Sequence, residues 1–277
     1  KGGVMMKKFL VAQSKEEALS LKRLHAKSVF YAGGTEINRL ESAVQAEVAI
    51  DLSKLGLNRI EEKKDEIIIG SMATLQTIAT SSEVPAWLKE AALFCGSFTR
   101  RNMATIGGNF ALMLGRSYVG PVLLASRAIL LIATINEKGK YAEDEVPVRE
   151  FHEHISSYQG ALILGFKIRK SDRFVGTLRF AVSSQNRASV TVGFGAEKDL
   201  SKVRVYAAVY TVGVLRLKET ESRIEKGEIT TEEEIAKSVA SEVTVKSDYT
   251  GSGEYKRYIA GEGVAMLYGE FLKGGRR

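Results

Sequence analysis

Two glycine-glycine segments of similar design have the composition of loops that bind a diphosphate. The first reads Tyr31-Ala32-Gly33-Gly34-Thr35-Glu36, and the second reads Ala104-Thr105-Ile106-Gly107-Gly108-Asn109. Glycine tolerates a positive φ and lets the backbone come close to a ligand, and successive N–H groups in such turns form a nest for anions. One Gly-Gly pair usually marks only a turn. Two pairs, each followed by a hydroxyl or amide side chain, favour one long ligand with a pyrophosphate at its middle.

Other kinds of chemistry find little support among the remaining polar residues. His152 and His154 form a His-x-His pair, but Glu153 between them favours a solvated turn or short helix, so no metal site is predicted. No serine stands in a nucleophile elbow, and no acid–base dyad is visible, so no catalytic residue is predicted. Arg100 and Arg101 precede the second segment, where a surface pair and an attraction for phosphate or a partner are equally good interpretations.

Composition places the chain among ordinary folded proteins. Its residues are 44% hydrophobic and 26% charged. Its length of 277 residues predicts two or three subdomains. No apolar run reaches the roughly 18 residues of a membrane span, so no membrane association is predicted. Cys95 is the only cysteine, which excludes an internal disulfide and an iron–sulfur cluster held by this chain's thiolates alone. A cytoplasmic location is the resulting prediction.

The net charge of +7 is spread over scattered basic pairs and does not form a stripe with interleaved aromatic residues. Such a distribution predicts a positive field that attracts anionic cofactors or an acidic partner. Binding to nucleic acid is the weaker alternative, and nucleic acid is therefore not predicted as a partner.

The first Gly-Gly segment is expected at the end of a small β-α-β unit, residues 1–58. Strands are predicted over residues 8–12, 29–32 and 47–52. Between the first two of these strands, Ser14 and Glu17 form a capping box that begins a helix. A glycine turn that follows a buried strand is a position where α/β folds bind phosphates.

The remaining chain is expected to form two further parts, residues 59–172 and 173–277. The second part has predicted strands at 66–70, 128–135 and 162–169 and predicted helices at 74–80, 85–98 and 118–126. In the third part, residues 177–182, 190–196 and 203–211 are predicted to be three antiparallel strands. Two helices follow. One begins at the capping box Thr230-Thr231-Glu232-Glu233, and the other covers residues 253–272 with an apolar stripe that is typical of a core.

These segments, in this order, resemble the FAD-binding medium subunit of the molybdenum hydroxylases, the family of carbon monoxide dehydrogenase and xanthine dehydrogenase. Family members read roughly A-G-G-T-[DE] and A-T-[IV]-G-G-N at the two glycine segments, and residues 32–36 and 104–109 match closely. Residues 69–75 resemble the I-G-A-x-T-T-L segment of the family, and residues 101–103 resemble its R-N-V segment. Residues 251–257 resemble its G-S-A-E-Y-R-R segment. The resemblance therefore extends over nearly the whole chain.

The resemblance implies an α+β fold. Two subdomains would form a FAD-binding fold of the vanillyl-alcohol-oxidase (PCMH-like) type, followed by a C-terminal domain of a three-stranded antiparallel sheet and helices. Both glycine segments would hold the FAD pyrophosphate through backbone N–H groups, and the side chains of Thr35 and Asn109 would add hydrogen bonds. The cofactor-binding residues implied are Phe30, Tyr31, Ala32, Gly33, Gly34, Thr35, Glu36, Ile37, Cys95, Thr105, Ile106, Gly107, Gly108, Asn109, Tyr118, Ile163 and Arg179.

One position departs from the family pattern. After the second glycine segment the family has S-P-x-x-D, whose aspartate bonds the cofactor, whereas this chain reads Leu114-Gly115-Arg116-Ser117-Tyr118. Tyr118 can hydrogen-bond or stack on a ring, but it brings no carboxylate. Arg116 can pair with a phosphate instead.

The resemblance also implies a role as an electron relay. An iron–sulfur subunit would pass electrons to FAD on this chain, FAD would deliver them to NAD or another acceptor, and a separate molybdenum cofactor subunit would oxidise the substrate. Two alternatives remain open. One is a flavin-poor structural or assembly subunit of the same fold, and the other is a free-standing FAD oxidoreductase.

Overall fold

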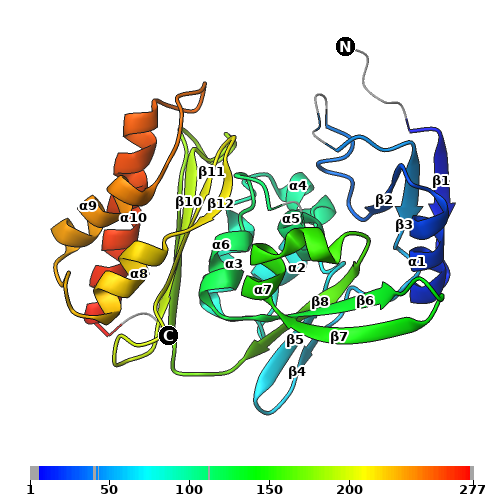
Figure 1. Cartoon of the computed structure of the whole chain (residues 1–277), viewed down its shortest axis with the longest axis horizontal. Helices are drawn as coiled ribbons and strands as arrows, with labels where there is room; N and C mark the ends of the chain where they lie inside the picture. Colours follow the sequence, from blue (N-terminus) through cyan, green and yellow to red (C-terminus); the bar gives the residue numbers. More distant parts are fainter. Residues whose placement is uncertain (1–5, 40–41, 43, 112, 275–277) are drawn as a thin grey trace. The chain divides into compact units, whose positions relative to one another are not determined.

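The structure is a computed structural model that describes residues 6–39, 42, 44–111 and 113–274 (Figure 1). It contains two compact units, and each unit is assembled from three separate stretches of chain. The first unit comprises Lys1–Thr77, Phe98–Ala111 and Ile129–Arg169, and the second comprises Ile78–Ser97, Leu112–Ala128 and Lys170–Arg277. The sequence-based boundaries at residues 58 and 172 fall between the three sheets and stay a prediction of domain organisation.

A three-stranded parallel sheet begins the first unit, in the order β1-β3-β2. Its strands are β1 (Lys8–Val11), β2 (Ser28–Tyr31) and β3 (Val48–Asp51), all at predicted positions, and α1 (Lys15–Leu24) connects the first two. The Oγ of Ser14 accepts from the N–H of Glu17 at 3.1 Å, as the capping box predicts. The Glu17 carboxylate, however, accepts from the N–H of Gln13 at 2.7 Å, one residue before the helix cap.

The second sheet of this unit has five strands in the order β4-β5-β8-β6-β7, and all neighbours are antiparallel. Its strands are β4 (Ile60–Glu62), β5 (Glu66–Gly70), β6 (Ile129–Ile135), β7 (Tyr141–Pro147) and β8 (Leu162–Arg169). The edge strands β4 and β7 were not predicted, because most of their residues are exposed and charged and so carry no apolar alternation. Leu19 of α1 shares a core with Leu162 and Leu164 of β8, so α1 joins the two sheets.

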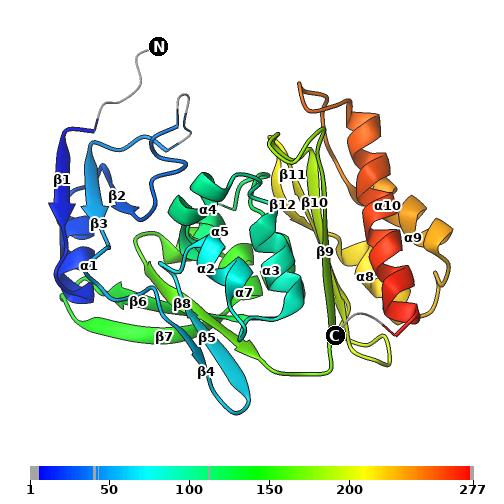
Figure 2. The same cartoon turned by 180° about the vertical axis from the view of Figure 1, so that it is seen from behind.

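Helices cover one face of the five-stranded sheet (Figure 2). They include α5 (Ile106–Ala111), which packs on β8, and α7 (Val148–Glu153), which packs on β6 and β7. The ring of Phe110 lies 5.0 Å from that of Phe166 and 6.0 Å from that of Phe151, centroid to centroid. This aromatic contact fixes α5, and with it the second glycine segment, on the sheet.

The second unit is built on a four-stranded antiparallel sheet, β12-β11-β10-β9. The three predicted strands are present as β9 (Phe174–Phe180), β10 (Val190–Ala196) and β11 (Arg204–Val209). A fourth strand, β12 (Gly213–Arg216), extends the expected three-stranded sheet. Only four residues long and joined to β11 by a tight turn, β12 has too short a pattern to be recognised in sequence.

Helices lie on both faces of this sheet. On one face α10 (Gly253–Leu272) has the predicted bounds and packs with α9 (Glu232–Glu242), beside α8 (Lys218–Glu225). On the other face lie α3 (Ala86–Leu93) and α6 (Gly120–Ala125) (Figure 2). The capping box of α9 joins Thr231 and Glu234, one residue later than predicted. None of the helices in the described part of the chain combines the length and apolar character needed to cross a bilayer.

One predicted helix is divided in two. Residues 85–98 were expected to be helical throughout, but α3 ends at Leu93, and α4 (Phe98–Met103) begins a separate helix. Gly96 between them has a φ of +47°, which interrupts the α-helical backbone. The short α2 (Leu75–Thr80) agrees with the predicted helix at 74–80.

Candidate functional site

The first glycine segment follows β2 directly and forms a concave turn. Gly34 has a φ of +65°, and a Cβ at this position would lie 2.2 Å from the Tyr31 hydroxyl. The N–H groups of Gly33, Gly34 and Thr35 find no acceptor among the residues that the structure describes. Successive unpaired N–H groups around a left-handed residue make an anion nest, here at the carboxyl end of a parallel strand. The turn therefore presents a left-handed glycine and three successive N–H groups at the end of β2, and phosphate binding there stays a prediction.

The two glycine segments meet within the first unit. A Cβ at Gly33 would lie 1.5 Å from the carbonyl oxygen of Met103 and 3.3 Å from the backbone nitrogen of Ala104. The first loop therefore packs directly on the end of α4, where the chain enters the second segment. Only glycine permits this approach, because real Cβ atoms essentially never come within 3.0 Å of such a neighbour.

The sequence suggested that the second glycine segment is a turn with left-handed residues, and this expectation was wrong. Gly107 and Gly108 lie in the first turn of α5, and neither has a positive φ. The N–H of Gly107 donates to the carbonyl oxygen of Ser71 at 2.9 Å, and that of Gly108 donates to Thr105 Oγ1 at 3.1 Å. The N–H of Asn109 donates to the carbonyl oxygen of Thr105 at 2.9 Å. These backbone donors are used within the fold, so the first segment is the one with amides left for a ligand.

The two glycines of α5 have different surroundings. A Cβ at Gly107 would lie 2.7 Å from Cβ of Ser71, so glycine at 107 is required by packing. Gly108 is exposed, and a Cβ there would meet only Thr105 Oγ1, at 3.0 Å. Packing within the described chain therefore does not require glycine at 108. Its bare backbone offers a surface that a ligand can approach closely.

Ser71 is a candidate that the sequence analysis did not single out, although it lies in the matched segment 69–75. Its side chain is 3% exposed, and its hydroxyl finds no hydrogen-bond partner in the described part of the chain. Its N–H donates to the carbonyl oxygen of Leu164 at 2.9 Å. Leu164 follows Ile163 in β8, so this hydrogen bond brings Ser71 close to Ile163, one of the predicted cofactor contacts. A buried hydroxyl without a partner is costly, and a ligand atom can satisfy it.

A cavity of about 310 Å³ lies beside both segments in the first unit. Thr74 lines the cavity and forms a β-bridge with Thr105 of the second segment. Ser53 also lines it and follows Leu52, whose N–H donates to the carbonyl oxygen of Tyr31 in the first segment. The other lining residues are Leu57, Asn58, Met72 and Thr77. Its volume falls in the lower range of small-molecule sites.

Charged groups near these segments are paired within the first unit. The Glu36 carboxylate lies 3.2 Å from the Arg39 guanidinium, which offsets a negative charge beside the nest. Arg101 donates to Oε1 of Gln76 at 2.9 Å. Among the described residues, no group of three or more His, Cys, Asp or Glu side chains is placed to hold a metal ion. The His-x-His pair was expected in a solvated turn or a short helix, and His152 lies in the short helix α7.

The remaining predicted residues, Cys95, Tyr118 and Arg179, belong to the second unit. The guanidinium of Arg179 lies 6.0 Å from the centroid of the Tyr118 ring, and both groups are at least partly buried. Arg179 also donates to the carbonyl oxygens of Ser183 and Ser184. A Cβ at Gly96, next to Cys95, would lie 2.2 Å from the same Ser184 oxygen. The loop that contains Ser184 therefore contacts Arg179 and the Cys95–Gly96 segment, and Arg179 lies beside Tyr118.

The family model for the FAD binding domain in molybdopterin dehydrogenase matches residues 5–169, which is more than half of the chain. The chain belongs to this family. The match covers both glycine segments, Ser71 and Ile163.

Known relatives of this FAD-binding family member extend over its full length. YgfM of Escherichia coli K12, an uncharacterized protein, is 29% identical over 272 residues, 98% of each chain. A chain of carbon monoxide dehydrogenase from Hydrogenophaga pseudoflava, in a form lacking the Mo-pyranopterin moiety, has a TM-score of 0.83 at 18% identity. The superposition covers 98% of this chain and 99% of that one. A chain of quinoline 2-oxidoreductase from Pseudomonas putida 86 has a TM-score of 0.78 at 17% identity, with 99% of each chain covered. The α+β fold is therefore that of these oxidoreductase chains.

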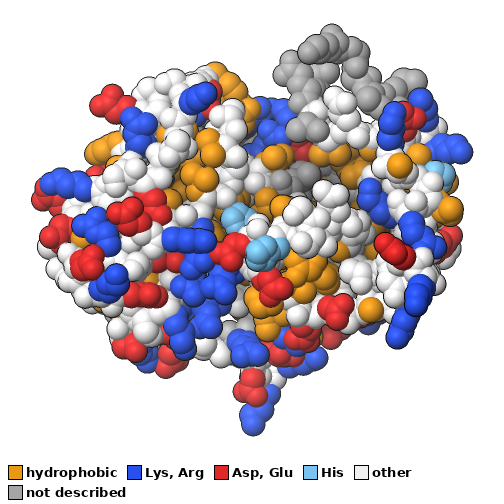
Figure 3. Space-filling model, in the orientation of Figure 1, with side chains coloured by type: hydrophobic (Ala, Val, Ile, Leu, Met, Phe, Trp, Pro, Cys, Tyr) orange, Lys and Arg blue, Asp and Glu red, His pale blue; other side chains and the backbone are white. Residues whose placement is uncertain are grey.

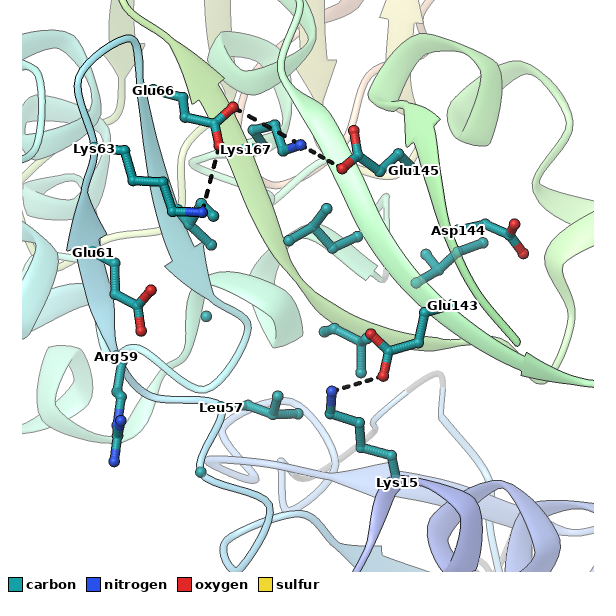
Figure 4. Close-up of a pocket in the computed structure, with 16 residues that line it drawn as sticks. Lys15, Leu57, Arg59, Glu61, Lys63, Glu66, Glu143, Asp144, Glu145 and Lys167 are labelled. Atoms are coloured by element: carbon teal, nitrogen blue, oxygen red, sulfur yellow. Dashed lines mark hydrogen bonds and ion pairs between the residues drawn. The ribbon is translucent and has the colours of Figure 1, made fainter. Parts of the chain in front are cut away.

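A larger cavity of the first unit, about 460 Å³, lies on one face of the five-stranded sheet (Figure 4). Its lysines face carboxylates. Lys167 pairs with Glu66 and Glu145, and Lys15 lies 2.8 Å from Glu143 (Figure 4). These ion pairs are satisfied within the protein, which is typical of a solvated sheet face.

Proposed function

We propose that this chain binds FAD and acts as the FAD-binding electron-transfer subunit of a molybdenum hydroxylase complex. The observation that carries this proposal is the first glycine loop. The N–H groups of Gly33, Gly34 and Thr35 have no acceptor in the described chain, and Gly33 packs on Met103 at the entrance to the second segment. Membership of the FAD-binding family supports FAD as the ligand.

Several residues of the first unit fit a bound pyrophosphate. The three free N–H groups donate to phosphate oxygens, and the side chains of Thr35 and Asn109 add donors. The open backbone of Gly108 lets the ligand come close, and the unpartnered hydroxyl of Ser71 supplies a further hydrogen bond. Hydrogen bonds to a charged acceptor are about twice as strong as neutral ones, which favours a phosphate over a neutral ligand.

The protein supplies no acid or base in this proposal. When bound, FAD supplies a ring that accepts electrons from one redox partner and releases them to another. The chain binds the cofactor and orients it. The proposal also includes the other predicted contacts. In the first unit these are Phe30, Tyr31, Ala32, Glu36, Ile37, Thr105, Ile106, Gly107 and Ile163, and in the second unit they are Cys95, Tyr118 and Arg179.

The proposed partners are an iron–sulfur subunit, which delivers electrons, and a molybdenum cofactor subunit, which oxidises the substrate. The electrons then pass to NAD or another acceptor, and the complex works in the cytoplasm. Support comes from the fold shared with chains of carbon monoxide dehydrogenase and quinoline 2-oxidoreductase. On the face shown in Figure 3, Lys and Arg side chains alternate with Asp and Glu over α8 and α9, a surface suited to a protein partner more than to nucleic acid.

One observation favours a second candidate, a flavin-poor structural subunit of the same fold. Tyr118, where the family has an aspartate, is 8% exposed and lies against the Arg179 guanidinium. The position therefore holds a buried aromatic ring and brings no carboxylate to a cofactor. In this case the chain would keep the fold and its partners and would not retain FAD.

The visible absorption spectrum of the chain after incubation with FAD and desalting separates the two candidates. The proposal predicts about one FAD per chain. We expect Gly108→Val to remove FAD, because the added isopropyl group stands on the open surface of α5. Ala111→Val is the matched control, since it places the same isopropyl side chain at an exposed position of the same helix.

Wild-type chain that retains no flavin while its circular dichroism spectrum is that of the folded protein would establish the structural candidate. Full FAD retention by Gly108→Val would refute the proposed approach of the ligand to α5.

A further inference from the structure

A third cavity of the first unit, about 330 Å³, lies away from the glycine segments. The last turns of α1 contribute Leu19, Lys22 and Arg23, the end of β6 contributes Thr134 and Ile135, and residues 157–161 close the cavity. Lys22 is hydrogen-bonded to Ser28, the first residue of β2, whereas the first glycine loop follows the last residue of that strand. The cavity and the proposed FAD site therefore lie at opposite ends of β2.

The lining of this cavity carries a net positive charge, although the hydroxyl of the lining Tyr158 donates to the Glu150 carboxylate at 3.0 Å. Its lining contains two cations, Lys22 and Arg23, and no aspartate or glutamate. The sheet-face cavity in Figure 4 differs on this point, because there the ammonium groups of Lys15 and Lys167 pair with carboxylates. Two positive charges that line one cavity without a carboxylate in its wall favour the binding of an anion there.

Both cations are anchored by neutral carbonyl groups. The ammonium of Lys22 donates to the carbonyl oxygen of Ser28 at 2.5 Å, and the guanidinium of Arg23 donates to that of Asn136 at 3.2 Å. Among the described residues, the partners found for these two groups are carbonyl oxygens and not carboxylates. Burial lowers the pKa of Lys22, as expected for a half-buried ammonium without an acidic neighbour. An ammonium has three donors and a guanidinium has five, so each retains donors for a ligand.

The other walls provide neutral donors and apolar surface. The hydroxyl of Ser157, the hydroxyl of Thr134 and the carboxamide of Gln159 line the cavity without a hydrogen-bond partner in the described residues. Leu19 and Ile135 add apolar surface beside the two cations. The combination suits a ligand with an anionic end and a small apolar body.

We propose that this cavity binds a phosphate monoester on a small apolar body. A phosphate monoester carries about two negative charges near neutral pH, because its second pKa is about 6, and so balances Lys22 and Arg23. Its oxygens accept from the guanidinium in a bidentate manner and from the ammonium as a point charge. The site is independent of the proposed FAD function, since it shares no residue with the glycine segments.

Calorimetric titration of the full-length chain with phenyl phosphate tests this proposal. The titration is run with and without saturating FAD, and benzoate serves as a monoanionic comparison. We expect saturable binding of one phenyl phosphate that FAD does not alter, with weaker binding of benzoate. Arg23→Gln and Lys22→Met should each weaken it about ten-fold or more, because each removes a charge-assisted hydrogen bond. Lys64→Met removes the same charge from an exposed position outside the cavity and should have no effect.

The side chain of Arg23 is exposed, so Arg23→Gln keeps the test valid if Lys22→Met perturbs the end of α1. Circular dichroism of each variant confirms the fold. The proposal is overturned if no saturable binding occurs, if Arg23→Gln binds phenyl phosphate as the wild type does, or if Lys64→Met weakens binding equally. Competition by FAD would place the phosphate in the glycine loop and would overturn it as well.

Discussion

The contact between Gly33 and Met103 allows a quantitative test of the site. In Gly33→Ala the new Cβ would lie 1.5 Å from the Met103 carbonyl oxygen, while real Cβ atoms essentially never approach closer than 3.0 Å. The first loop and the end of α4 must therefore move apart by at least the difference between these two distances, 1.5 Å. Neither side can yield by rotating a side chain, because the Met103 group is backbone.

A displacement of this size exceeds what a hydrogen bond tolerates. A donor–acceptor distance near 2.9 Å would rise beyond 4 Å, where the bond is lost. If one or two charge-assisted bonds to the pyrophosphate are lost at about 1.5–3 kcal/mol each, the free energy of FAD binding weakens by roughly 3 kcal/mol, or about a hundred-fold in Kd. The strands are not directly affected, so the midpoint of thermal unfolding should fall by only a few degrees.

Titration of the quenching of flavin fluorescence measures this change in Kd. Gly56→Ala is the control, because Gly56 is another loop glycine of the first unit with no atom within 4 Å of an added Cβ. Its φ of +66° makes it the more strained position for alanine, so the control overestimates any effect of backbone strain. If Gly33→Ala bound FAD as tightly as Gly56→Ala and the wild type, the packing of the two segments would have no part in binding.

Two further predictions concern stability. Lys15 and then Tyr141 hold the pKa of Glu143 below its ordinary value of 4.5. Because the folded-state pKa is lowered, this stabilisation is present above pH 4.5 and is lost as the pH falls through the lower folded value. The gap in Tm between wild type and Lys15→Met, followed by circular dichroism, should therefore shrink in acid, and a gap that stays constant from pH 7 to pH 3 would contradict this pairing. Lys256 is 0% exposed and pairs with Asp248, so Lys256→Met should lower the free energy of unfolding by about 3–5 kcal/mol in urea titrations. The exposed pair Lys237–Glu233 is the comparison, and Lys237→Met should cost far less; equal losses would contradict the importance of burial.

The sequence predicted those elements whose local signals and tertiary environment agree. The central strands β5, β6 and β8 are continuous apolar runs, and Ser252 caps the predicted start of α10. The strand β7 was missed because Glu143, Asp144 and Glu145 occupy an edge where charge is tolerated and even protective. Its place in the sheet depends on pairing with β6, which lies outside any local window.

The candidate site was predicted in composition and only partly in geometry. Gly34 has the expected positive φ, because a left-handed residue in a turn after a strand is a local property. Gly107 looked the same in sequence, but it is required by packing on Ser71, a residue distant in the chain. Ser71 itself gave no local signal, since an unpartnered buried hydroxyl is visible only once its neighbours are known. The sequence therefore indicated that the two glycine segments come together in the fold, but it did not indicate the backbone conformation of each segment, and their contact with a ligand stays a prediction.

The interleaving of the two units has a consequence for the order in which the newly made chain can fold on the ribosome. The central strand β8 of the first unit ends at Arg169, so the five-stranded sheet cannot close until that residue has emerged. The helices α3 and α6 are made earlier, yet the sheet they cover begins at Phe174. All six residues of α6 are buried in the folded protein. This apolar helix therefore stays exposed until the strands of the four-stranded sheet have been synthesised. Neither unit can be obtained as a continuous fragment. Truncation before β9 should leave α3 and α6 without the sheet they cover, and so exposed to aggregation or to chaperones.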